Sequence, residues 1–228
     1  CRVLYEISSD KGYLVRAVNL YNEAWAYCSS NESMPESGLI QYNLGLAYRE
    51  LGMKNSAYSC LTEAADLFIK ALDVYPLEVN PYLYAHIQFN LGNVYLLLSE
   101  EKDIYINKSK AAYEEALKVW IPEIYPLNYA RAHRCMGDVY SKMYQMDGNE
   151  DNLKSALAEY NEALKFFSMK TYPVDYAKTS IQIGNTYFML AQPECGGKWT
   201  KEIAKLNCIF LFCQKILNCY IDNDTIII

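Results

Sequence analysis

Small and apolar residues recur at intervals of three and four positions along most of the chain. Two such series are Ala64, Phe68, Ala71 and Leu72, and Ala156, Tyr160, Ala163 and Leu164. This spacing places the residues on one face of an α-helix, whereas a half-buried strand alternates every second residue. All seven prolines fall between such segments, where helices begin or end. The pattern therefore predicts an all-α protein.

The breaks between these segments give approximate helix bounds. The expected helices span residues 11–29, 37–52, 55–74, 82–99, 103–120, 127–146, 151–169, 174–191 and 199–221. A side-chain oxygen just before a helix can accept a hydrogen bond from the first turn. On this basis we expect N-caps at Asn55, Asp103, Asp151 and Thr200.

The helical pattern also repeats. A glycine followed three residues later by tyrosine occurs four times, and the glycines stand 47, 45 and 47 residues apart. The pairs are Gly45 with Tyr48, Gly92 with Tyr95, Gly137 with Tyr140, and Gly184 with Tyr187. A second motif places an alanine 21 residues before each glycine, at Ala24, Ala71, Ala116 and Ala163. Glycine inside a helix costs about 0.5–1 kcal/mol relative to alanine, so four at one phase indicate close helix-to-helix approach.

These alternating motifs resemble the tetratricopeptide repeat (TPR). The second helices carry its small, aromatic and small residues: Ala17, Tyr21 and Ala24; Ala64, Phe68 and Ala71; Ser109, Tyr113 and Ala116; Ala156, Tyr160 and Ala163. The usual unit has about 34 residues, so units of 45 and 47 residues resemble the long-unit arrays of large multidomain signalling proteins. The resemblance implies an α-solenoid of antiparallel helical hairpins, wound as a right-handed superhelix.

The resemblance covers residues 1–191. It predicts a truncated first unit, then units near 37–74, 82–120, 127–169 and 174–191, followed by a C-terminal capping or docking helix and tail at 192–228. Residues 1–14 align on 140–153, so we expect a fragment of a longer array that begins inside a first helix. The apolar run 209–212 and the closing residues 226–228 leave open a second function, a structural oligomerisation module joined through 199–228.

Composition narrows the choice of partner. The 228 residues are 52% hydrophobic and carry a net charge of −6, which argues against nucleic acid as a partner. The longest apolar run is far shorter than the ~18–20 residues of a membrane span. The eight cysteines are scattered without a CxxC pair, and there are two histidines, so we expect reduced thiols, a cytoplasmic location, and no metal or cofactor.

In a TPR superhelix the first helices line the concave face, and the resemblance implies a peptide-binding stripe there. Its members are Tyr42, Arg49, His86, Phe89, Asn93, Arg131, Arg134, Asp138, Lys142, Lys178 and Asn185. Of these, Asn93, Arg131, Arg134, Lys178 and Asn185 resemble the carboxylate clamp of chaperone-binding relatives. Guanidinium groups pair with carboxylates in bidentate fashion, which favours an acidic peptide. The alternative is that these are ordinary solvated helix charges, with Arg134 and Asp138 pairing within one helix.

Enzyme chemistry has no support in the sequence. His133 and Cys135 stand two residues apart on one helix, so they face different ways and cannot form a nucleophile–base pair. Cys195-Gly-Gly-Lys198 lacks the preceding strand that a phosphate loop requires. We therefore expect a non-enzymatic protein–protein interaction scaffold, a sensor or adaptor segment of a larger protein.

Overall fold

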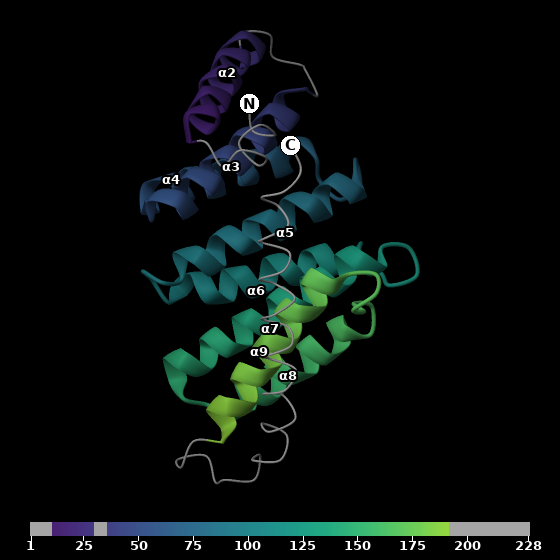
Figure 1. Ribbon diagram of the computed structural model, residues 1–228. Helices are drawn as coiled ribbons and strands as arrows, with labels where there is room; N and C mark the ends of the chain where they lie inside the picture. Colours follow the sequence, from purple (N-terminus) through teal and green to yellow (C-terminus); the bar gives the residue numbers. More distant parts are fainter. Residues whose placement is uncertain (1–10, 30–35, 192–228) are drawn as a thin grey trace, which may run out of the picture. The chain divides into compact units, whose positions relative to one another are not determined.

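The computed structural model describes residues 11–29 and 36–191, and every regular element within them is an α-helix. Figure 1 shows these helices in chain order. They are α2 (Lys11–Ser29), α3 (Glu36–Asn55), α4 (Tyr58–Val74), α5 (Pro81–Leu98), α6 (Ile104–Leu117), α7 (Pro126–Asp147), α8 (Glu150–Leu164) and α9 (Pro173–Leu190). The all-α prediction is confirmed. The helix expected at 199–221, the cap at Thr200 and the segment 192–228 lie outside the described residues.

Prolines begin three of the helices. The first residues of α5, α7 and α9 are Pro81, Pro126 and Pro173. Proline lacks a backbone N–H, and this costs nothing at a first helical position because an N–H there has no acceptor within the helix. Asn80 caps α5, its side chain accepting a hydrogen bond from the backbone N–H of Leu83 at 3.0 Å.

Two of the expected N-caps are wrong. Asn55 is the last residue of α3, and α4 begins after Ala57, which has no capping side-chain bond. Asp151 lies inside α8, because Asn149 takes the cap position and accepts from the N–H of Asp151. Asp103 does precede α6, but its side chain makes no capping bond. Local sequence therefore identified the turns correctly but not the residue that caps each helix.

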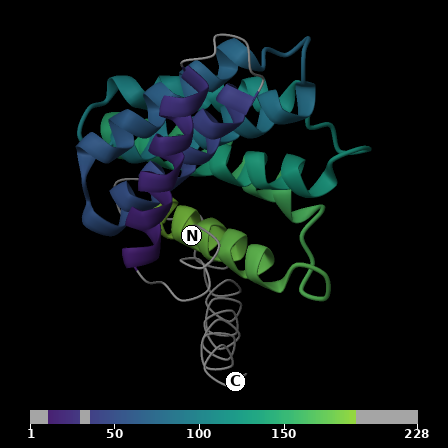
Figure 2. The same cartoon turned by 90° about the horizontal axis from the view of Figure 1, so that it is seen from above.

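The described residues form two compact units, which divide between Val119 and Trp120. In the first unit, α2 to α6 each pack on the next helix, and α3–α4 and α5–α6 are antiparallel hairpins (Figure 1 and Figure 2). One core cluster gathers around Phe68, Ile87 and Val94, between α4 and α5. A second includes Leu14 and Leu44, joining α2 to α3.

The second unit contains the α7–α8 hairpin, with α9 packed on α8 and touching α7. Its core includes Leu153, Tyr160, Ile183 and Leu190, all at most 5% exposed. A smaller cluster around Ala130 and Phe167 joins the start of α7 to the end of α8. Each unit thus has a core of its own.

Each described hairpin is closed by a glycine against an aromatic ring. A Cβ atom at Gly45 would lie 2.7 Å from the Phe68 ring, and one at Gly92 would lie 2.7 Å from Tyr113. Gly137 is closer still to Tyr160. The expected close approach is confirmed at these three glycines. The second helix expected to pack on Gly184 falls outside the described residues.

The other repeated positions are also packing positions. Ala71, Ala116 and Ala163 are fully buried, whereas Ala24 of α2 is half-buried. Tyr48, Tyr95, Tyr140 and Tyr187 are half-buried and lie against the core clusters of their own units.

Candidate functional site

In the first unit, stripe residues of α3 and α5 meet around Asn90. The side chain of Asn90 is 7% exposed. Its Nδ2 donates to the Tyr42 hydroxyl at 3.2 Å and to the His86 carbonyl at 2.7 Å. Its Oδ1 accepts from the Arg49 guanidinium, which also pairs with Glu50. Both the oxygen and the nitrogen of this amide are therefore hydrogen-bonded, as is usual for a buried polar group.

Asn90 is missing from the predicted stripe, although its position carried a signal. It lies two residues before the repeated glycine, and the equivalent residues are Asn43, Cys135 and Gln182. Three of these four residues carry amides. Gln182 is likewise a hydrogen-bonding residue, in the second unit.

The remaining stripe residues of the first unit pack against neighbouring rings. Phe89 lies 5.6 Å from Tyr113 between ring centroids, and the Asn93 Oδ1 accepts from the Tyr113 hydroxyl at 2.9 Å. His86 lies edge-on to Tyr82 at 4.5 Å, and burial lowers its pKa, because a desolvated imidazole disfavours its charge. Phe89 and Asn93 thus help to close the α5–α6 hairpin.

In the second unit, Asp138 of α7 is the centre of a polar network. Its Oδ1 accepts from the Tyr160 hydroxyl at 2.8 Å and from the Gln182 amide at 3.1 Å, and Arg134 lies 3.4 Å from Oδ2. Burial raises the pKa of the Asp138 carboxyl, and Arg134 and the two neutral donors oppose that rise. The network joins α7, α8 and α9. It includes the intrahelical Arg134–Asp138 pair, as expected if these residues are ordinary helix charges.

The other stripe residues of this unit lie around that network. Arg131 pairs with Asp175 of α9 at 3.3 Å, and Asn185 donates to Gln182 at 3.2 Å. Lys178 is exposed, one turn after Asp175, and Lys142 is half-buried, one turn after Asp138. Asp175 was not predicted, because it lies 44 residues from Arg131 and no local pattern relates them.

We define the α7–α9 face by the charged and amide residues of α7 and α9 that form these contacts or lie one helical turn from them. It comprises Arg131, Arg134, Asp138, Lys142, Asp175, Lys178, Gln182 and Asn185. Residues 120–191 contain seven basic and eight acidic side chains, and this face holds four of the basic and two of the acidic ones. The face is therefore locally positive within a nearly neutral unit, and its chemistry suits a carboxylate.

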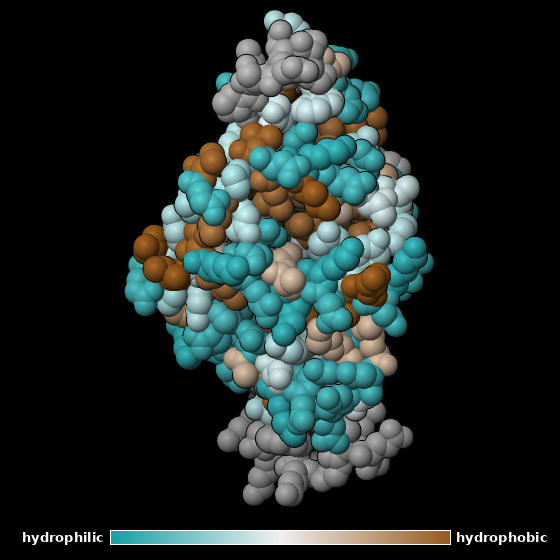
Figure 3. Space-filling model, turned by 180° about the vertical axis from the view of Figure 1, so that it is seen from behind, coloured by the Kyte–Doolittle hydropathy of each residue, from teal (hydrophilic) through white to brown (hydrophobic). Residues whose placement is uncertain are grey.

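The described part of the chain was also compared with the requirements of a metal site, a membrane span and an apolar patch. Within residues 11–29 and 36–191, no three histidine, cysteine, aspartate or glutamate side chains converge as metal ligands. The described helices are all too short or too polar to cross a bilayer. Exposed apolar side chains form separate groups among polar ones on the face drawn in Figure 3.

Comparison with known proteins defines the fold only. No family model matches the sequence, and no curated protein matches it. Among solved structures, the crystal structure of BtubC (BKLC) from P. vanneervenii is similar, with 18% sequence identity and a TM-score of 0.62. The match covers 91% of this chain and 78% of that chain. At this identity, the similarity establishes a shared all-helical fold.

Proposed function

We propose that the chain is a TPR-like α-solenoid, wound as a right-handed superhelix, which acts as a protein-interaction scaffold. The three glycine–aromatic closures support this architecture, because they recur at the same phase in α3–α4, α5–α6 and α7–α8. A repeated closure gives each hairpin the same internal geometry, and stacked identical hairpins produce an extended binding surface. In this proposal the array is a sensor or adaptor segment of a larger protein, without catalytic activity of its own.

We further propose that the partner is an acidic peptide and that it binds the α7–α9 face. The observation that carries this proposal is the concentration of four cations there against two carboxylates. Asp138 is held by three hydrogen bonds, so Arg134 serves mainly as its counter-ion.

Arg131 and Lys178 are the cations best suited to a ligand. Lys178 is exposed, and the Arg131 side chain is 43% exposed. The guanidinium has five N–H donors, so a peptide carboxylate can bind its exposed side while Asp175, whose side chain is 19% exposed, keeps its ion pair.

Fluorescence anisotropy with a labelled hexapeptide of glutamates and a free C-terminal carboxylate tests the proposal. The variant Arg131→Gln/Lys178→Gln should weaken binding by about tenfold, since two charged contacts are lost. The matched control is Lys154→Gln/Lys165→Gln, which removes the same charge from α8 and its C-cap, where both side chains are more than 60% exposed. Equal affinities of the two double variants would refute the α7–α9 site.

A further inference from the structure

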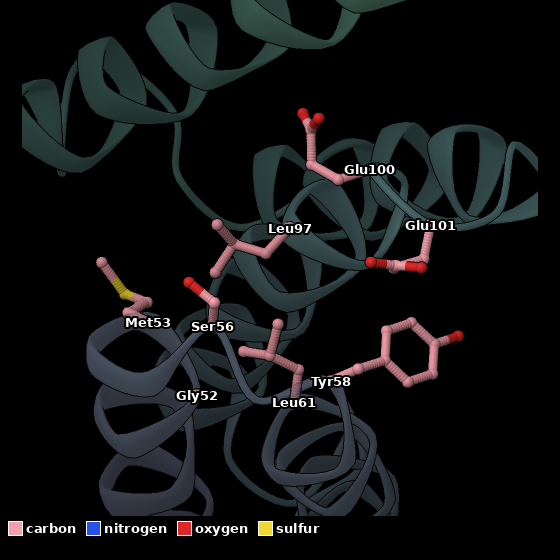
Figure 4. A pocket seen from close by; sticks show the side chains of 8 residues that line it. All are labelled: Gly52, Met53, Ser56, Tyr58, Leu61, Leu97, Glu100 and Glu101. Atoms are coloured by element: carbon pink, nitrogen blue, oxygen red, sulfur yellow. The ribbon is translucent and has the colours of Figure 1, made fainter.

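A cavity of about 230 Å³ opens at one end of the first unit, between the α3–α4 turn and the α5–α6 turn. Figure 4 shows Met53, Leu61 and Leu97 forming its apolar wall, with Ser56, Tyr58 and Glu101 around it. It belongs to neither the Asn90 network nor the α7–α9 face.

The size of the cavity limits its occupant. Engineered apolar cavities of about 150 Å³ bind benzene, whereas sites for drug-sized ligands begin at about 300 Å³. A volume between these values suits a single side chain or a short alkyl chain. The leucine and methionine side chains offer that chain an apolar contact surface.

The polar residues select the charge of the occupant. The Glu101 carboxylate extends toward the cavity above the Tyr58 ring, whereas the Glu100 carboxylate points away from that ring (Figure 4). The Lys102 ammonium already lies 5.9 Å from the centre of the Tyr58 ring. A carboxylate and an aromatic face together attract an ammonium ion, so an incoming ammonium group takes the place that the exposed Lys102 side chain holds at this ring.

The turn beside the cavity is held in an uncommon backbone conformation. Ser56 has φ of +48°, and the equivalent residue of the α7–α8 turn, eleven residues after the repeated glycine, is Gly148 with φ of +67°. A serine in the left-handed region costs more than a glycine. The first unit thus carries a strained residue where the second uses glycine, and that residue lines the cavity.

We propose that this cavity binds a primary alkylammonium group, with the alkyl stem against Leu61 and Leu97 and the ammonium at Glu101 and Tyr58. A free alkylamine and a lysine side chain both carry this chemistry. The site goes beyond the proposed scaffold function and does not depend on it, because its residues and those of the α7–α9 face belong to different units.

Methyl NMR of the full chain, following Met53, Leu61 and Leu97, tests the site. The probes are n-pentylammonium, N-acetyl-lysine-N-methylamide and uncharged 1-pentanol. We expect saturable shifts at these methyls with at least one ammonium probe, and the tighter of the two identifies the source of the ligand. 1-Pentanol should bind at least fivefold more weakly.

Glu101→Gln should weaken binding of the ammonium probe by about fivefold. Glu63→Gln, which removes another exposed carboxylate, this one on α4, should leave that binding unaltered. Neither substitution touches the core. Equal binding of 1-pentanol, equal effects of the two variants, or no saturable shift would each overturn the proposal. Loss of acidic-peptide binding in the α7–α9 variants has no bearing on this result.

Discussion

Glycine stands inside three helices at positions where a side chain would collide with an aromatic ring. Its helical cost of about 0.5–1 kcal/mol relative to alanine is smaller than the roughly 1.5–3 kcal/mol gained by burying a phenylalanine side chain. Phe68 is fully buried against Gly45. The closure is therefore favourable at the level of one residue pair, which explains why it recurs along the chain.

Gly45→Ala should lower the free energy of unfolding by about 1–2 kcal/mol. Overpacking typically costs 1–3 kcal/mol, and the better helix propensity of alanine returns up to about 1 kcal/mol. Urea denaturation followed by circular dichroism measures the net effect.

A double-mutant cycle provides the control for this prediction. Leucine lacks the ring atoms that a Cβ at position 45 would meet, so Gly45→Ala should cost much less in a Phe68→Leu background. An undiminished cost in that background would show that the ring is not the source of the penalty.

At the scale of the element, the helices were predictable because apolar periodicity and proline positions are local features of the sequence. Pro81, Pro126 and Pro173 begin their helices within one residue of the expected starts. The α8 helix ends five residues early, at Leu164, before a turn held by the Ser168 and Thr171 hydroxyls. The apolar periodicity of the sequence continues through residues 165–169 because Phe167 remains buried after the helix has ended.

The contacts between helices were predictable only where the repeat supplied them. Gly45 and its equivalents recur at the same position of each repeat, so their role in helix packing could be inferred from the sequence. Arg49 and Asn90 are 41 residues apart, and no pattern in the sequence joins them. Their pairing depends on how α3 and α5 approach, which is a tertiary property.

Asn80→Ala should lower the free energy of unfolding by about 1 kcal/mol, because it removes the side-chain acceptor of the Leu83 N–H. Asn55→Ala is the matched control, since Asn55 ends α3 and caps no helix. Chemical denaturation of both variants provides the measurement. If Asn55→Ala proved the more damaging change, the assignment of the caps would be wrong.

At the scale of the whole molecule, the distribution of charge matters more than its sum. The chain carries −6 overall, yet the α7–α9 face carries four cations and two carboxylates. The Debye length is about 8 Å at physiological ionic strength. An acidic ligand at that distance therefore responds to the local cations, while the field of remote carboxylates is screened.

This balance predicts how salt affects binding of the glutamate hexapeptide. Raising the salt concentration from 0.1 M to 0.5 M should weaken its binding on the order of tenfold, because added ions screen the pairs with Arg131 and Lys178. Anisotropy titrations at several salt concentrations give the slope. Arg131→Gln/Lys178→Gln should flatten that slope, whereas Lys154→Gln/Lys165→Gln should preserve it, since those lysines pair with carboxylates elsewhere on the unit. A slope shared by both double variants would mean that the peptide responds to the net charge rather than to this face.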